Sequence, residues 1–342
     1  MIALELAYWQ ETTLRVVIGL AALLALTGGV VYLFLFKFVS FMQSRLGPME
    51  AGPYGSLQLL AEVGKWLQKE DIFTERADRI VFAASPFVVI TSTFLLFVVV
   101  PGGPNAVVAD LDNSLLYAMA VSAISVIGIL MAGWASANKY ALLGGLRAAG
   151  QLVAYELPMI LAIVGVVIQA GSLNLQDIVY AQSEGEIFGV GWIGNPFILT
   201  QFVGFLVFMI AMQAELTQTP FDMPVAESEL VAGYMVEYSG IRFLVYFIAE
   251  FATAVGFSAI AATMFLGGWA LPADWGISRD WMHVIGPIVA ATKAIALTGL
   301  VFWVRFSFPR FREDQLQRLA WKFLIPITLA NIVVTGVLKV AF

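Results

Sequence analysis

Six acidic side chains gather in one short part of an otherwise apolar chain. Between positions 214 and 250 the sequence carries Glu215, Asp222, Glu227, Glu229, Glu237 and Glu250. A carboxylate beside hydrocarbon is costly, and it usually faces a polar cavity or a partner. Because 60% of the chain is hydrophobic, this acidic cluster predicts a functional site.

Proton exchange is the chemistry that three acids predict. Glu215 and Glu250, together with the more distant Glu156, lie within or beside strongly apolar runs. A carboxyl group that is buried without a cation partner can exchange a proton near neutral pH. Three such groups on neighbouring helices would form a proton relay. The alternative is a static role in assembly, in which each carboxylate is paired; the candidate cations are Lys139, Arg147, Arg242 and Lys293.

The remaining acids of the cluster follow two prolines. Pro220 and Pro224 forbid one continuous helix, so the backbone here must be protected by protein or line a cavity. Glu227 and Glu229 are two residues apart, so on a helix one would face the interior and the other an aqueous partner. The alternative for this pair is a solvated acidic loop.

Composition excludes several kinds of site. The chain has no cysteine and one histidine, His283, so it cannot by itself hold a thiolate-bound iron–sulfur cluster or zinc, or a multi-histidine metal or haem site. A net charge of −6 is no sign of nucleic-acid binding. We therefore expect no metal or cofactor bound by this chain alone.

The elements that carry the acids are predicted to be membrane-spanning helices. A helix needs about 20 mostly apolar residues to cross a bilayer, and the runs are continuously apolar, unlike the alternating strands of a barrel. Eight segments qualify, at about 14–36, 80–100, 115–134, 152–170, 198–216, 243–267, 284–304 and 323–341. Gln201, Gln213 and Lys293 dilute the fifth and seventh. The predicted fold is an all-α polytopic membrane protein, with residues 1–342 forming a single integral-membrane domain.

Basic residues predict the orientation. Fourteen of the 18 Lys and Arg residues lie in the loops after the odd-numbered segments. The positive-inside rule then places loops 37–79, 135–151, 217–242 and 305–322 in the cytoplasm and both termini outside. In the first of these loops, apolar residues recur at helical spacing from Ser56 to Lys69. That pattern predicts an amphipathic helix, on the membrane surface or against a partner.

Four stretches together resemble one known family. They are Gln43–Glu70 with its two Gly-Pro pairs, Asn138–Arg147 continuing to Pro158, Pro220–Gly240, and Phe302–Lys322. In this order they resemble the quinone-site membrane subunit of NADH:quinone oxidoreductase, respiratory complex I, which is the H subunit of the bacterial enzyme and subunit 1 of the mitochondrial one.

The resemblance implies eight main helices with termini on the periplasmic side. It implies a subunit that walls the quinone chamber, binds quinone as substrate, and contacts other membrane-arm and peripheral-arm subunits, which hold NADH, FMN and the iron–sulfur clusters. Glu156, Glu215 and Glu250 match the family's intramembrane acids, which begin its proton-coupling path. Residues matched to the quinone chamber are Arg45, Lys65, Phe221, Asp222, Glu227, Glu229 and Arg242, and Arg147 falls on a further recurrent basic position.

The chain departs from the family pattern in places. Met49 and Glu50 stand where Asn-Arg is usual, and Thr217 and Gln218 where Asn-Arg is again usual. Val225 replaces a usual Glu. Smaller departures occur at Leu35, Glu62 and Met235. The loss of loop charges weakens a role for fixed loop ion pairs, whereas the three membrane acids are intact.

We therefore expect a membrane subunit of a proton-pumping NADH:quinone oxidoreductase, inactive alone, in a bacterial plasma membrane. Within the superfamily, the alternative is the membrane subunit of an energy-converting hydrogenase or of a quinone oxidoreductase with another donor. A stand-alone ion carrier is the alternative from another class, although the two halves show no convincing internal repeat. A purely structural scaffold is the third.

Overall fold

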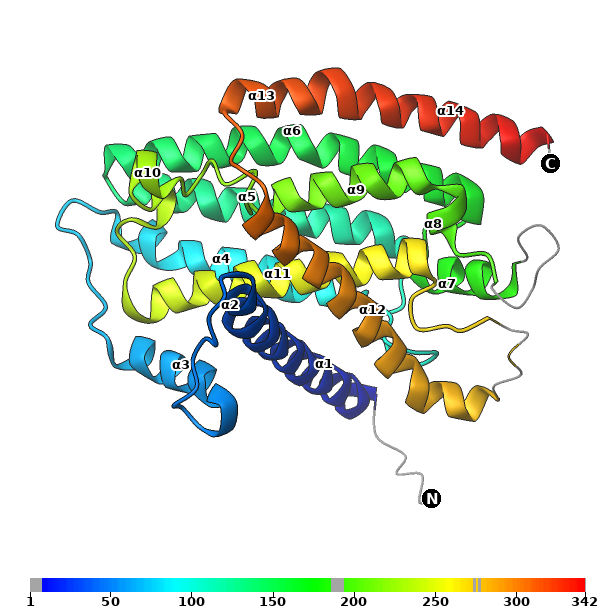
Figure 1. Ribbon diagram of the computed structural model, residues 1–342, viewed down its shortest axis with the longest axis horizontal. Helices are drawn as coiled ribbons and strands as arrows, with labels where there is room; N and C mark the ends of the chain where they lie inside the picture. The colour runs from blue at the N-terminus through cyan, green and yellow to red at the C-terminus, as the bar shows by residue number, and fades with distance from the viewer. Residues whose placement is uncertain (1–7, 186–193, 273–274, 276–277, 342) are drawn as a thin grey trace.

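The chain folds as a bundle of helices (Figure 1). The computed structural model describes residues 8–185, 194–272, 275 and 278–341, and no β-strand occurs among them. The α-helices are α1 (Tyr8–Val30), α2 (Val39–Met42), α3 (Gln58–Gln68), α4 (Arg79–Phe97), α5 (Ser114–Ala135), α6 (Lys139–Ala170), α7 (Leu175–Glu184), α8 (Phe197–Thr200), α9 (Phe202–Glu215), α10 (Glu227–Leu230), α11 (Gly240–Leu266), α12 (Arg279–Ser307), α13 (Glu313–Leu319) and α14 (Ile325–Ala341). Short π or 3-10 turns lie at Val31–Phe38, Pro53–Gly55, Gly233–Met235 and Ala320–Leu324.

Seven helical stretches of the described chain are long and apolar enough to cross a membrane. They are Thr12–Met42, Arg79–Phe97, Ser114–Ala135, Lys139–Ala170, Gly240–Leu266, Asp280–Ser307 and Glu313–Ala341. They coincide with seven of the eight predicted segments, and the chain is a polytopic all-α membrane protein. The fifth segment differs, because it divides at Gln201 into α8 and the shorter apolar helix α9.

The polar residues that dilute the apolar segments all have internal partners. The Gln201 amide donates to Thr335 and accepts from Asn331, both at 2.8 Å. Gln213 donates to the Thr219 carbonyl at 2.8 Å. Lys293 donates to three backbone carbonyls at the end of α11, those of Leu266, Gly268 and Ala270. Since hydrocarbon offers no hydrogen bonds, these contacts offset the cost of placing polar groups in such segments.

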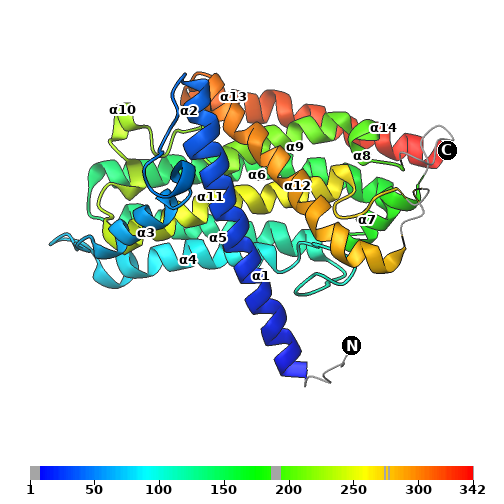
Figure 2. The ribbon, with the colours of Figure 1, turned by 60° about the horizontal axis from the view of Figure 1, so that its bottom comes forward.

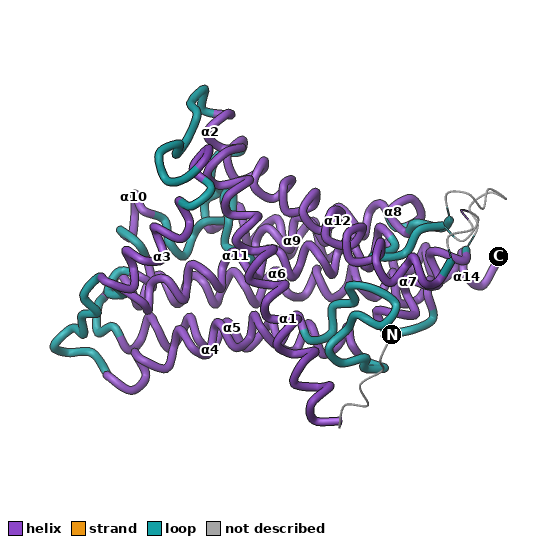
Figure 3. The backbone as a smooth tube through the Cα atoms, turned by 90° about the horizontal axis from the view of Figure 1, so that it is seen from below, coloured by secondary structure: helices purple, strands orange, loops and turns teal. Residues whose placement is uncertain are grey.

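The long loops gather toward one end of the bundle. In Figures 1 and 3, loops 37–79 and 217–242 lie toward the left, together with the start of α6. The connection between α4 and α5, helix α7 and the end of α14 lie toward the right. Figure 2 shows α1 and α12 crossing the face of the bundle obliquely, where both contact α11. Loops 37–79 and 217–242 and the start of α6 belong to three of the four loop regions that the charge pattern groups together.

Helix α6 is longer than its apolar run. The predicted segment begins at 152, whereas α6 begins at Lys139, because the Asn138 side chain caps its first turn by accepting from the Tyr140 backbone N–H at 2.9 Å. Most of the predicted loop 135–151 is therefore helical. Glycines allow close packing here: a Cβ on Gly144 would lie 2.7 Å from the backbone of Gly233. The extra turns of α6 form a base for the 217–242 loop.

The amphipathic helix predicted from Ser56 to Lys69 forms as α3. Its Trp66 ring stacks on Phe243 of α11, with centroids 4.6 Å apart. Leu60 and Leu67 are exposed. The helix thus docks on the bundle by one edge and leaves an apolar surface outward.

Candidate functional site

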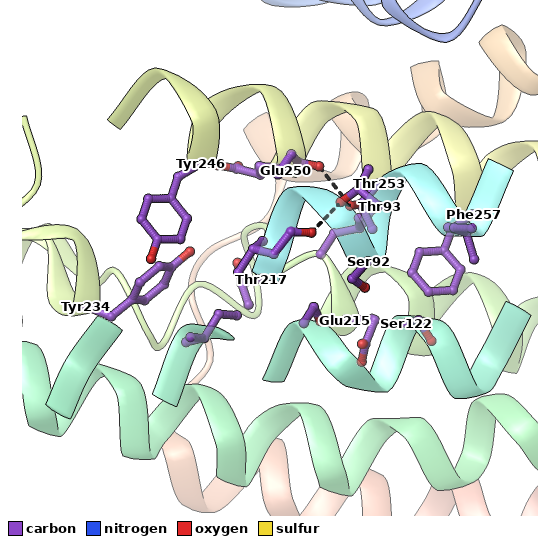
Figure 4. A pocket seen from close by; sticks show the side chains of 16 residues that line it. Ser92, Thr93, Ser122, Glu215, Thr217, Tyr234, Tyr246, Glu250, Thr253 and Phe257 are labelled. Carbon is purple, nitrogen blue, oxygen red and sulfur yellow. Dashed lines mark hydrogen bonds between the residues drawn. The ribbon is translucent and has the colours of Figure 1, made fainter. Parts of the chain in front are cut away.

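Two of the three predicted membrane acids line the same small cavity. The cavity has a volume of about 60 Å³, which is room for a few water molecules. Glu215 comes from the end of α9 and Glu250 from α11, and Figure 4 shows both among the lining side chains. Other polar lining residues are Ser92, Thr93, Ser122, Ser125, Thr217, Tyr234, Tyr246 and Thr253.

Hydroxyl groups form much of the polar wall. Thr93 of α4 and Thr253 of α11 hydrogen-bond across the helix interface at 2.8 Å (Figure 4). Ser92 donates to the Val121 carbonyl at 2.7 Å, and Ser122 to the Met119 carbonyl at 2.8 Å. Because hydroxyl groups both donate and accept, a wall of this kind can stabilise water between two carboxyl groups.

Glu215 and Glu250 have different surroundings. The Oε2 atom of Glu215 is buried and has no hydrogen-bond partner in the described chain. Glu250 accepts a hydrogen bond from the Gln218 amide, and its Oε1 lies 3.5 Å from Nη1 of Arg305. Glu215 therefore has one buried oxygen without a partner, whereas Glu250 has an amide and a guanidinium beside it.

Glu156 lies outside this cavity. It is half-buried in the middle of α6. Its charge still acts on Glu215, the acid at the end of the neighbouring α9. The structure therefore brings Glu215 and Glu250 into one cavity and leaves Glu156 beside it.

The 217–228 part of the loop connects the cavity to Asp222. Asp222 forms an ion pair with Arg310 at 3.0 Å. Burial raises the pKa of Asp222, an effect that the guanidinium groups of Arg310 and Arg305 oppose and the nearby Glu227 reinforces. Phe221 is buried next to it, with its ring 5.2 Å from Tyr155.

Gln151 holds this loop against α6. Its side-chain amide is 2% exposed and donates to the carbonyls of Ala214 and Phe221, both at 2.7 Å. On the other side, the Phe311 backbone N–H donates to the Pro220 carbonyl at 2.9 Å. The loop is thus fixed between α6 and the connection from α12 to α13.

Glu227 and Glu229 lie in α10 and are both exposed. Glu229 pairs with Arg147 of α6 at 2.6 Å. The prediction that one of the two acids faces the interior is wrong in this chain. The reason is that α10 has only four residues and lies over α6 rather than within the bundle.

Three basic residues matched to the quinone chamber lie away from Asp222. Arg242 pairs with Asp71 at 3.0 Å and covers the Phe73 ring. Arg45 is exposed and donates to Gln43 at 2.8 Å. Lys65 is exposed on α3, next to Trp66. These residues surround the loop end of the molecule but form no single cluster with the loop acids.

The cations proposed for static pairing have other partners. Arg147 and Arg242 bind loop acids, Lys293 binds carbonyls, and Lys139 lies over the Tyr140 ring. The cation beside Glu250 is Arg305, a residue of the Phe302–Lys322 stretch that was not among the predicted pairing partners. The sequence likewise did not predict a role in the site for Gln218, Gln151 or Arg310. Arg305 and Arg310 could have been chosen from the Phe302–Lys322 stretch, where basic residues recur next to an apolar segment.

No three His, Cys, Asp or Glu side chains of the described residues come together as a metal site requires. What the arrangement can do is hold, release and exchange protons. It combines two acids in one cavity, a loop acid with a raised pKa, and an arginine beside Glu250 and another beside Asp222.

Comparison with known proteins identifies the family of this chain. The family model described as NADH dehydrogenase matches residues 14–336. The chain is 44% identical over 329 residues to the H subunit of the NADH-quinone oxidoreductase of Brevibacillus brevis, covering 95% of this chain and 94% of the relative. It is 42% identical to the H subunit of Anoxybacillus flavithermus, over 98% and 96% of the two chains, and 42% identical to that of Dehalococcoides mccartyi, over 88% and 79%. A match over nearly the whole length, together with the apolar bundle and its acidic cavity, means that the chain belongs to the NADH dehydrogenase family.

Proposed function

We propose that this chain is the quinone-site membrane subunit of a proton-pumping NADH:quinone oxidoreductase. The names of its relatives support this role over that of a hydrogenase subunit or a stand-alone carrier. The chain works only within the assembled enzyme, where partner subunits hold NADH, FMN and the iron–sulfur clusters. Its own contributions are part of the quinone-access chamber and the first acids of the proton path.

The observation that carries the proposal is the shared cavity of Glu215 and Glu250. Two carboxyl groups around a small polar space can pass a proton between them through water. The loop that begins at Thr217, a cavity-lining residue, leads to Asp222. A change of charge near Asp222, Glu227 or Glu229 is therefore transmitted to the cavity over a short path.

The coupling follows from electrostatics. Reduction of quinone beside the loop adds negative charge before protons arrive, and this raises the proton affinity of nearby acids. In this proposal the proton affinity changes first at Glu227 and Glu229 on the surface, and then at Asp222 behind them. Glu215 and Glu250 then exchange a proton through the cavity, and Glu156 provides the next acid along α6.

The test uses the assembled complex in sealed membrane vesicles. Glu215→Gln and Glu250→Gln should each abolish proton pumping coupled to quinone reduction, because a side-chain amide cannot take up or release a proton near neutral pH. Glu184→Gln, an exposed acid in α7 at the opposite end of the bundle, is the matched control and should pump normally. Full coupled activity in the two cavity variants would refute the relay. If the two variants instead lower the amount of assembled complex, while each assembled complex pumps normally, the acids have a purely structural role.

We also propose that the chain lies in a bacterial plasma membrane with both termini on the outer side. Purification separates this role from that of a carrier. A complex subunit should co-purify with several partners and have no transport activity alone, whereas a carrier would be active by itself.

A further inference from the structure

The end of α12 and the connection to α13 contact the acidic loop and the cavity at successive points. Arg305 lies 3.5 Å from Glu250, Arg310 lies 3.0 Å from Asp222, and the Phe311 backbone binds Pro220. One short segment therefore reaches the membrane acid and the loop acid together.

Arg305 interacts with both acids. It forms an ion pair with Glu250, and its charge also acts on Asp222. Its Nη1 atom is buried, yet it has no hydrogen-bond partner in the described chain. The contact with Glu250 is thus an ion pair without a closed hydrogen bond, and the guanidinium keeps an unused donor.

The neighbouring groups leave Arg305 free to act on Glu250. Asp222 is already paired with Arg310, so it does not need Arg305 for neutralisation. The other group on Glu250 is the neutral amide of Gln218, which is 5% exposed and leaves its own Oε1 without a partner. Arg305 therefore supplies the positive charge at Glu250 among the described ion pairs.

We propose that Arg305 is a positioning residue that controls when Glu250 is ionised, by moving between the field of Glu250 and that of Asp222. This inference rests on the proposed function. With Arg305 beside Glu250, the guanidinium stabilises the charged form of that carboxyl group. When negative charge increases near Asp222, Arg305 is drawn toward the loop, and Glu250 accepts a proton across the cavity from the carboxyl group of Glu215. The reverse movement returns that proton.

The cost of this movement is small. Arg305 stays on the last turn of α12, where a cation is favoured by the helix dipole in either position. A long side chain on a fixed helix can change its partner without moving the backbone. Nη1 of Arg305 and Oε1 of Gln218 both lack a hydrogen-bond partner in the described chain. A shift of the arginine side chain can give these atoms partners.

The experiment compares Arg305→Gln, Arg305→Lys and the double variant Arg305→Gln/Gln218→Arg in the assembled complex. Arg305→Gln should lower pumping-coupled turnover about tenfold, the effect of losing one charge-assisted contact. Arg305→Lys should retain part of it. Gln218→Arg should restore turnover in the double variant, because residue 218 already contacts Glu250 and would return a cation to it. Arg318→Gln, an exposed arginine on α13, is the control and should behave as the parent.

Proton-to-electron ratio and the amount of assembled complex are measured together. A merely structural arginine would lose assembled complex, and a new arginine at position 218 would not restore the ratio. Normal turnover in Arg305→Gln, with pumping abolished in Glu250→Gln, overturns the role of Arg305 and leaves the proposed function standing. Normal pumping in Glu250→Gln instead overturns the proposed function itself.

Discussion

The two cavity acids are chemically identical but are partnered differently. Glu215 has a buried oxygen with no partner, while Glu250 contacts Gln218 and Arg305. Burial favours the neutral form of an acid, and a nearby cation favours the charged form. Two acids that line one cavity but differ in their partners are suited to act as the two ends of a proton exchange, which is what a relay requires.

One substitution at Asp222 can separate an effect of its charge on turnover from an effect on assembly. We expect Asp222→Asn to reduce coupled quinone turnover severalfold, because Arg310 and Arg305 then lack the loop charge they face. Assembly should change little, since a partly exposed ion pair contributes about 1 kcal/mol at most. Turnover per assembled complex is the measurement. Equal turnover of variant and parent would remove Asp222 from the coupling path.

At the scale of elements, a side chain on one helix fixes the shape of a loop from another part of the chain. Gln151 of α6 binds two carbonyls on either side of the turn that follows α9. Gly144 allows the loop backbone at Gly233 to lie directly on the same helix. The acids of the loop are therefore positioned by α6, although they follow α9 in sequence.

Replacing Gln151 should loosen that loop. In Gln151→Ala the Phe221 carbonyl loses its donor, while the Ala214 carbonyl keeps the Thr217 backbone N–H. A buried group left without a partner costs about 1–3 kcal/mol. We expect less assembled complex and a lower midpoint of thermal inactivation. Gln68→Ala, an exposed glutamine in α3, is the control. An unchanged midpoint in Gln151→Ala would mean that the loop is held by its other contacts.

On the scale of the whole molecule, the fold separates two ends. Helices α1 and α12 cross the bundle obliquely, α1 from the N-terminal end of the chain and α12 from the side of α7 (Figure 2). The long loops with most of the basic residues lie at that acidic end. By the positive-inside rule, this separation supports the proposed orientation in the membrane.

The absence of cysteine from the sequence makes this orientation simple to test. We expect a single cysteine at Glu75 in the loop before α4 to react with a membrane-impermeant maleimide only from the cytoplasmic side. A cysteine at Glu184 in α7 should react only from the outer side. Both positions are exposed, and labelling in detergent checks that each is reachable. The opposite pattern in oriented vesicles would invert the proposed topology.

The sequence by itself determined the apolar segments, the break after Glu215 and the grouping of the loops. These features depend on local composition: about 20 apolar residues make a span whatever they pack against, and Pro220 and Pro224 interrupt a helix in any context. The limits of local reasoning appear at α6 and α9. Asn138 caps α6 well before its apolar run at 152, and Gln201 divides the fifth segment because it finds partners on α14.

Only the tertiary structure decided which groups meet. Arg305 is 55 residues from Glu250 and Gln151 is 70 from Phe221, so no spacing rule connects them. Their contacts depend on how far each helix is rotated and tilted against its neighbours, and these are set by packing over the whole bundle. The sequence therefore predicted that acids lie in the membrane, whereas the fold decided that Glu215 and Glu250 share a cavity, that Glu156 lies beside it, and that an arginine from α12 reaches one of them.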